Sequence, residues 1–296
     1  MTRVTLSWIK WLLVVLCGLI VLGRLTVEFR NSLVSPESRF NLVYVNPVKE
    51  SVSVVTFDPV ERKILQLNYP SSLEINSRSE GTYAIKNLYK LGNYKSQGGE
   101  FARRKVQGFM RLPIVGYVVG DRGDFEKDLI QSLGWGKVET NLTLIDRIYL
   151  ILRLKEYNKA QIDEGELLRL GILIKSNNGD GYNYQPERML TYVGKSFFDW
   201  GVGKEGATVA IINESGIDGM GSDVAAFLTS LGLDVVMVRS GTSVQDKTKY
   251  IVSDPKNYSK ALQLIENVFH FPKYEVGETT EYRAAIVFWI GKDALE

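Results

Sequence analysis

A short basic run is the first candidate for binding chemistry in this sequence. Arg103, Arg104 and Lys105 follow Gly98-Gly99 in a segment whose apolar residues have helical spacing. Cationic side chains held close together attract phosphates and other anions, so these three residues are a candidate anion or ligand site. The alternative is that they form the solvated face of a helix, which is the commoner use of a charge run.

The acidic residues and the single His and Cys are weaker candidates for a functional site. Asp121, Asp124 and Asp128 could form a carboxylate cluster, but Asp124 and Asp128 lie four residues apart on a predicted helix, where they would cap and solvate its start. The chain has one His and one Cys. This excludes an internal disulfide, a Cys-rich zinc site and any chemistry that needs two imidazoles. We expect His270 to lie at a helix end, and we predict no catalytic residue and no metal ligand.

A glycine-rich turn follows a predicted strand near the C-terminus. Asn213, Gly216, Gly219 and Gly221 allow a tight strand-to-helix turn, and the Asn213 side chain can tie the loop by hydrogen bonds. Exposed amides at a helix start also favour anions. The spacing differs from that of dinucleotide-binding loops, however, and no Walker lysine follows. We therefore predict a structural turn.

The N-terminal segment is strongly apolar. The run from Trp11 to Gly23 carries no charge, and its extension to residues 6–27 reaches the roughly 20 residues needed to cross a bilayer. No small-x-small cleavage site follows, which argues against a signal peptide. We expect residues 1–30 to hold a cytoplasmic end and a single transmembrane helix at about 6–27, with the bulk of the chain extracytoplasmic. Cys17 would then lie in the membrane.

The remaining chain alternates strands and helices, which favours an α/β class. After a connector at 31–39, we predict a domain over 40–200 and a smaller α/β domain over 205–296. The expected strands are 40–45, 51–57, 64–69, 116–119, 208–212, 234–239, 248–252 and 284–290. The expected helices are 84–91, 101–110, 125–133, 142–154, 223–231 and 259–269. The polar segment 176–186 is predicted as a loop near the domain boundary, followed by a helix.

The helix over 142–154 has a broad apolar face. This face comprises Leu144, Ile145, Ile148, Ile151 and Leu152, and we expect it to pack into the core of its own domain. Asp146 and the arginines mark the opposite side as solvated, and Thr140 or Asn141 is the expected cap.

The last part of the chain resembles the LytR C-terminal domain. The resemblance covers Val209 to Gly219 with its Asn-x-x-Gly-x-x-Gly turn, Leu231-Gly232 before the next strand, and the closing Gly291-Lys292-Asp293. It implies a small domain attached to membrane-anchored cell-envelope proteins.

Residues 40 to about 135 are similar to a reduced LytR-CpsA-Psr catalytic domain. The similar segments include 41–45, 53–67 with Pro70, Gly98-Gly99, 112–119 and 125–134. The family transfers glycopolymers from a polyprenyl-pyrophosphate carrier to the cell wall. It places an Arg-Asp pair after the proline, where this chain has Ser71-Ser72, and the charged loop before the second strand is shortened to Asn46–Glu50. Phosphoryl transfer depends on such positioned charges, often with Mg²⁺.

The resemblance with these losses implies a non-catalytic, membrane-anchored envelope protein that binds or scaffolds in cell-wall glycopolymer assembly, without a cofactor. Its expected partners are a wall polymer, a polyprenyl lipid or envelope proteins. The 36 basic and 34 acidic residues give no reason to expect nucleic acid. The alternative is an active transferase that uses Mg²⁺ and a rearranged set of cations, drawn from Arg62, Arg78, Arg103 and Arg104.

Overall fold

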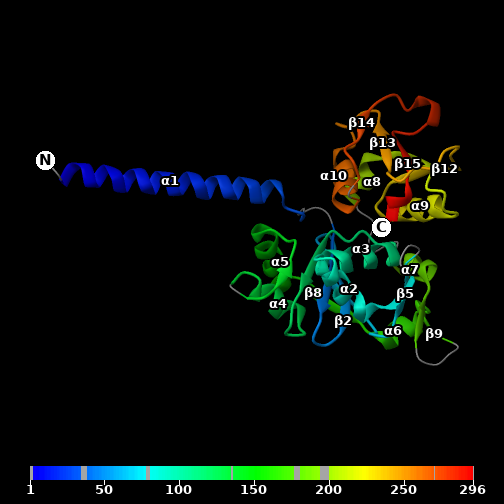
Figure 1. The fold of residues 1–296 in the computed structure, drawn as a ribbon, viewed down its shortest axis with the longest axis horizontal. Helices are drawn as coiled ribbons and strands as arrows, with labels where there is room; N and C mark the ends of the chain where they lie inside the picture. The colour runs from blue at the N-terminus through cyan, green and yellow to red at the C-terminus, as the bar shows by residue number, and fades with distance from the viewer. Residues whose placement is uncertain are drawn as a thin grey trace.

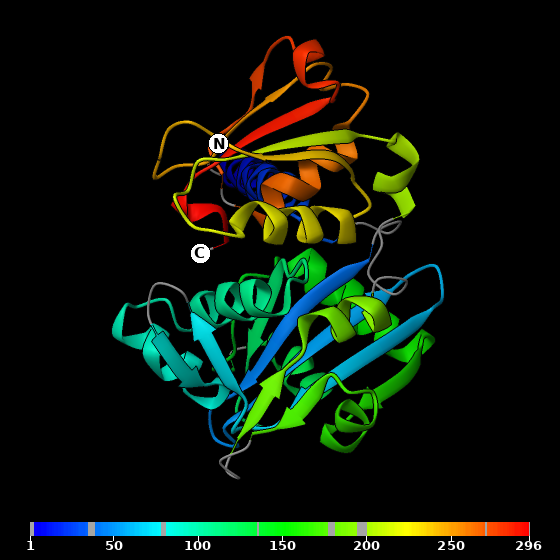
Figure 2. The ribbon, with the colours of Figure 1, turned by 90° about the vertical axis from the view of Figure 1, so that its right-hand side faces the viewer.

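Two β-sheets with their helices make up the body of the molecule, and one long helix extends from it (Figures 1 and 2). The computed structural model describes residues 3–34, 39–77, 81–134, 136–176, 181–193, 200–269 and 271–295. The mixed α/β class predicted from the sequence is confirmed.

The first sheet has six strands in the order β7-β6-β1-β2-β3-β8. β1 and β2 are antiparallel neighbours, as are β2 and β3, while β6 and β8 pair in parallel with β1 and β3. Every residue of β1 is buried, because helices cover both faces of the sheet. The strands are β1 (Phe40–Asn46), β2 (Ser51–Asp58), β3 (Lys63–Tyr69), β6 (Gly116–Val119), β7 (Glu139–Thr140) and β8 (Asn158–Ile162).

The two faces of this sheet carry different helices. Val43 and Val45 pack toward α2 (Leu88–Tyr94) and α3 (Gly98–Met110), whereas Leu42 and Tyr44 pack toward α4 (Phe125–Gln131) and α5 (Leu144–Glu156). The alternation of side chains along a strand produces these two cores. Smaller elements complete this part of the chain: β4 (Glu74–Ser77), β5 (Gly81–Ala84), η1 (Ile85–Asn87), α6 (Glu164–Arg169), β9 (Leu173–Lys175), β10 (Tyr182–Tyr184), α7 (Pro186–Val193) and α8 (Trp200–Glu205).

The second sheet has the order β12-β11-β15-β13-β14. Val209, Ile211 and Phe288 point toward helices α9 and α10, while Trp289 and Tyr282 pack on the other face. The elements are β11 (Thr208–Asn213), α9 (Met220–Ser230), β12 (Asp234–Ser240), β13 (Lys249–Val252), α10 (Ser259–Val268), β14 (Glu275–Val276), η2 (Thr280–Tyr282), β15 (Ile286–Ile290) and η3 (Lys292–Leu295). The predicted helices and strands of this region agree with these bounds to within three residues.

Helix α1 (Arg3–Arg30) projects away from both sheets (Figure 1). It covers residues 6–27, where we expected a transmembrane span. Within the described ranges, no helix combines the length and the apolarity needed to cross a membrane. The structure therefore gives the predicted anchor no support.

Some predicted elements were wrong. Residues 84–91 do not form one helix, because Ala84 ends strand β5 and α2 begins at Leu88. The predicted loop at 176–186 contains β10, which pairs with β9 in a hairpin. The helix expected after it is present as α7 and α8, with residues 194–199 outside the described residues. The domain limits at 40–200 and 205–296 stay predictions.

Candidate functional site

A pocket of about 340 Å³ lies where α3 faces the C-terminal part of the chain. Gln97, Glu100 and Arg104 line it from α3 and its N-cap, and Lys247, Phe271 and Asp293 line it from the other side. It contains side chains of both signs next to aromatic rings. Two of the three predicted ligand residues, Arg103 and Arg104, border this pocket.

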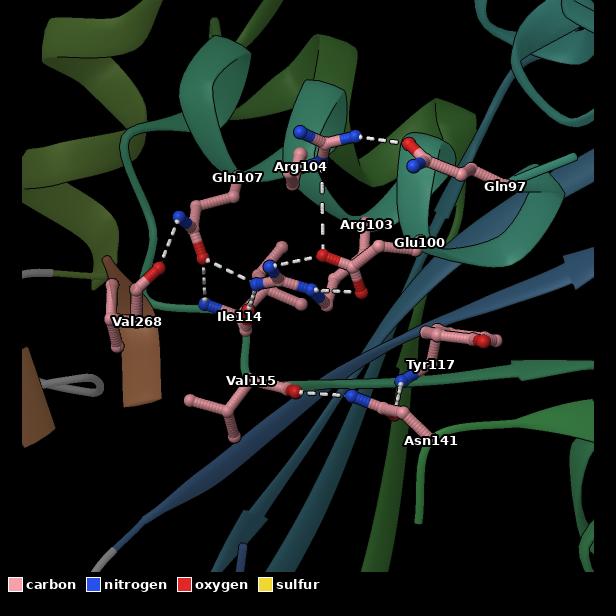
Figure 3. Close-up of polar contacts among 10 residues, drawn as sticks. All are labelled: Gln97, Glu100, Arg103, Arg104, Gln107, Ile114, Val115, Tyr117, Asn141 and Val268. Atoms are coloured by element: carbon pink, nitrogen blue, oxygen red, sulfur yellow. Dashed lines mark hydrogen bonds and ion pairs between the residues drawn. The ribbon is translucent and has the colours of Figure 1, made fainter. Parts of the chain in front are cut away.

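Arg103 is buried, with 1% of its side chain exposed. Its guanidinium contacts Glu100 at 2.6 Å and donates hydrogen bonds to the Gln107 side chain and the Ile114 carbonyl (Figure 3). A buried charge is tolerated when it is paired and hydrogen-bonded in this way. The expectation of a solvated face was wrong for Arg103, and its donors are already used by the protein.

Arg104 and Lys105 have different surroundings. Arg104 is 35% exposed, donates to Gln97 Oε1 at 2.7 Å, and places Nε 3.7 Å from Glu100 (Figure 3). The Lys105 ammonium lies 5.5 Å from the centre of the Phe101 ring, at the distance of a cation–π contact. The run therefore does not form a three-residue anion site, and Arg104 is the member best placed for a ligand in the pocket.

Gln107 joins the first sheet region to the C-terminal part. Its Oε1 accepts from Arg103 and from the Ile114 amide, while its Nε2 donates to the Val268 carbonyl at 3.0 Å (Figure 3). At the end of α3, Arg111 forms a second link through Asp223 of α9, at 2.7 Å. These contacts hold α3 against α9 and α10.

The start of α3 is already occupied by a carboxylate of the protein. Glu139 Oε1 accepts from the Gly99 amide at 2.9 Å, and Tyr89 donates to its other oxygen. A free helix N-terminus attracts anions, but an anion here would compete with Glu139. Burial, together with the nearby Glu139 and Glu100, raises the pKa of Tyr117 to about 12.

The three aspartates do not form a cluster of equivalent groups. Asp124 caps α4 as predicted, accepting from the amides of Glu126 and Lys127. Asp121 is exposed. Asp128 is fully buried and accepts a hydrogen bond from the Tyr44 hydroxyl at 2.7 Å, so the expectation that it solvates the helix start was wrong. Burial and the contact with Asp128 raise the pKa of Tyr44 above its ordinary value.

The glycine turn after β11 is held by its own side chains. Asn213 accepts from the Ser215 hydroxyl at 2.6 Å and donates to the Ile217 carbonyl at 3.0 Å. Gly216 and Gly219 have φ values of 71° and 77°, which disfavour other residues. Gly221 lies within α9, where an added Cβ would meet Val238 at 3.1 Å. These contacts account for the motif as a structural turn.

The closing Gly291-Lys292-Asp293 motif has a structural use as well. A Cβ on Gly291 would lie 2.6 Å from the Lys247 backbone, so the close approach requires glycine. Asp293 Oδ1 accepts from the Thr248 amide and hydroxyl, both at 2.7 Å. The motif thus fixes the wall of the pocket that Lys247 and Asp293 line.

Another candidate cation, Arg62, does not line the pocket beside α3. Arg62 is exposed in the turn before β3, where its carbonyl accepts from the Asn158 amide, while α3 packs against β1 and β6. Arg78 and His270 lie outside the described residues. In the described part of the chain, no three His, Cys, Asp or Glu residues lie close enough to hold a metal ion.

Sequence reasoning missed the pocket partners Glu100, Gln107, Lys247 and Asp293. The spacing Glu100-x-x-Arg103-x-x-x-Gln107 was the available signal, since residues three and four apart share a helix face. The residues from the C-terminal part carried no such signal, because only the folded chain brings them to α3.

Neither a protein-family model nor a curated protein sequence matches this chain. Among solved structures, the LytR-CPS2A-psr family protein YwtF (TagT) with bound octaprenyl pyrophosphate lipid is similar at 13% identity and a TM-score of 0.42, covering 57% of this chain and 93% of its own. Bacillus subtilis TagT is similar at 10% identity and 0.41, covering 58% and 96%, and B. subtilis TagV at 14% and 0.37, covering 54% and 96%. Such low TM-scores establish neither family nor function. The relation to this family stays a prediction from the sequence motifs.

Proposed function

We propose that this chain is a non-catalytic cell-envelope protein that binds the glycan portion of a wall polymer in the pocket between α3 and the C-terminal part. The observation that carries the proposal is Arg103. Its charge is used internally by Glu100, Gln107 and Ile114, so it is not available to stabilise a transferring pyrophosphate.

The chemistry of the pocket suits a sugar. Gln97, Arg104 and Lys247 supply donors, Glu100 and Asp293 supply acceptors, and Phe271 adds an apolar surface. Hydroxyl groups need both donors and acceptors, and a few placed polar groups beside an apolar wall are typical of small-molecule sites. The opposite charges nearly balance, which makes the pocket a poor match for a multiply charged anion by itself.

Titration calorimetry on the full chain tests this proposal. A soluble glycan repeat from a wall polymer should bind, and inorganic pyrophosphate should not. The variant Lys247→Ala should weaken glycan binding, whereas Lys63→Ala, which removes an exposed lysine on β3, should leave it unchanged. Absence of glycan binding, or equal losses in both variants, would refute the proposed site.

The alternative is an active transferase, favoured by the two cations Arg104 and Lys247 that border one pocket with side chains 35% and 76% exposed. A transfer assay with a polyprenyl-pyrophosphate-linked glycan and Mg²⁺ distinguishes the two. Turnover that disappears in Arg104→Ala would establish the transferase. Arg103→Ala is unsuitable for this test because it removes a buried structural group.

We also propose a location at the cell membrane, with α1 as the anchor, the N-terminus in the cytoplasm and the rest of the chain outside. Its support is the uncharged run from Trp11 to Gly23 in the sequence. Membrane fractionation followed by alkaline extraction tests it. Protein released by the alkaline wash would contradict an integral anchor.

A further inference from the structure

Helix α5 exposes apolar residues on one of its sides. Leu144, Ile148 and Leu152 follow one another at four-residue spacing and are 40%, 44% and 52% exposed. Helix α4 packs beside α5, where Arg147 donates to the Ser132 carbonyl, and exposes Ile130 and Leu133. We call these five side chains the α4–α5 patch. Exposed apolar side chains on two helices that pack together are candidates for an interaction site.

The end of α1 is fixed next to this patch. Glu28 Oε2 accepts a hydrogen bond from the Leu144 amide at 2.7 Å. Asp146 accepts from the Ser32 hydroxyl at 2.5 Å and from the Leu33 and Val34 amides at 3.3 Å. These bonds connect the chain that leaves α1 to the first turn of α5. Figure 1 shows α4 and α5 on the side of the body toward which α1 extends.

The exposed surface of α1 indicates what covers the patch. Trp11, Leu12, Val14, Val15 and Leu16 are all at least 48% exposed. Consecutive helical residues point in different directions, so apolar groups surround the helix, which suits a lipid phase better than one protein partner. Exposed Lys137 and Lys155 near α4 and α5 would face lipid headgroups, and basic residues favour anionic membrane surfaces.

We propose that the α4–α5 patch rests on the lipid bilayer into which α1 inserts, so that the body is seated on the membrane surface. The inference rests on the proposed membrane location. The exposed apolar residues of α1, the polar bonds that fix its end to the first turn of α5 and the exposed Lys137 and Lys155 all favour a lipid surface over a second copy of the chain.

Fluorescence of the full chain in vesicles tests the inference. The single native cysteine is replaced by Cys17→Ser, and an environment-sensitive dye is attached through Ile148→Cys. The matched control carries the dye through Ile174→Cys, a position 50% exposed on β9. In vesicles of phosphatidylcholine and phosphatidylglycerol with brominated acyl chains, we expect a blue shift and quenching at position 148 and neither at 174.

The outcomes separate this inference from the proposed location. If the full chain does not float with the vesicles, both are overturned. If it floats but position 148 behaves like position 174, the membrane location stands and the seated patch is refuted. A blue shift that depends on protein concentration and is insensitive to brominated lipid would assign the patch to a second copy and also overturn the inference.

Discussion

Helices α3 and α5 each have 13 residues, and each buries a charged side chain that the sequence assigns to a solvated face. In α3 the buried charge is Arg103, which meets the opposite charge of Glu100 one turn away. In α5 it is Asp146, which accepts, within the described part of the chain, from the Ser32 hydroxyl and from the amides of Leu33, Val34 and the capping Thr143. The Arg103 bonds hold α3 to the core of its own region. The Asp146 bonds hold α5 to residues 32–34, which are distant in sequence.

The largest effect should come from breaking the α3 pair. Arg103→Met removes the buried guanidinium together with its ion pair to Glu100 and its hydrogen bonds to the Gln107 side chain and the Ile114 carbonyl. We expect a loss of about 3–5 kcal/mol in the free energy of unfolding, as for other buried pairs deprived of one partner. Chemical denaturation of the full chain measures it. Arg104→Ala, at the partly exposed neighbour, should cost no more than about 1 kcal/mol. Similar losses in the two variants would contradict the distinction between them.

The next largest difference in stability should be between substitutions on the two apolar sides of α5. Leu150 is fully buried, so Leu150→Ala is expected to cost about 2–5 kcal/mol through lost contacts and a cavity. Ile148 is 44% exposed, and Ile148→Ala should change stability by less than about 0.5 kcal/mol when the protein is free of lipid. Thermal unfolding in lipid-free solution provides the comparison. A large loss from Ile148→Ala would show that its face is covered within the protein.

The Asp146 contacts should have a smaller and more local effect. Asp146→Ala loses both the capping box of α5 and the bonds to residues 32–34, whereas Thr143→Ala loses the cap alone. A lost cap costs about 0.5–2 kcal/mol, so both variants should be less stable by at least this amount. Only Asp146→Ala should expose the connector, which limited proteolysis after α1 would detect. Equal cleavage of the Thr143→Ala variant would contradict the role of Asp146 in holding residues 32–34.

The elements that the sequence predicted correctly are those with strong local signals. Strand β1 is a compact apolar run, β2 and β3 interleave apolar and polar residues, and turns separate the three strands, which match the expected bounds within one residue. Strand β8 was missed because Ile162 is its single buried residue, and its strand conformation depends on pairing with β3. The β4–β5 hairpin was missed because each of its strands has only four residues, which is too short for a clear pattern.

The face of α5 could not be predicted from spacing. Apolar residues occupy both Leu144, Ile148, Leu152 and the opposite positions Leu150 and Leu154, so either side could have been the core. Asp146 is buried as well, and its partners outside the helix, Ser32, Leu33 and Val34, are more than 100 residues away in sequence. Thr143 caps α5, while Asn141, one of the two expected caps, instead bonds to Tyr117 and Val115 of the sheet (Figure 3). In α3, by contrast, Glu100 and Gln107 are local partners that the spacing did contain.

The smallest effect on stability at neutral pH should come from two tyrosines, one near α3 and one at the end of α5. Burial and the neighbouring Glu139 raise the pKa of Tyr117 to about 12, while the pKa of Tyr157, at the end of α5, is raised by burial and lowered by Arg153. A raised pKa keeps the phenol protonated in the folded state. Its contribution to stability is therefore complete below an ordinary tyrosine pKa of about 10 and is lost as the pH rises toward 12.

Removing the neighbouring charge should move the two tyrosines in opposite directions. Glu139→Gln removes a negative charge and should lower the pKa of Tyr117, whereas Arg153→Gln removes a positive charge and should raise that of Tyr157. Absorbance at alkaline pH, taken as the difference between each variant and its Tyr→Phe partner, isolates each phenol. If neither pKa moved, burial alone would control both groups, and the local charges that distinguish the surroundings of α3 and α5 would not reach them.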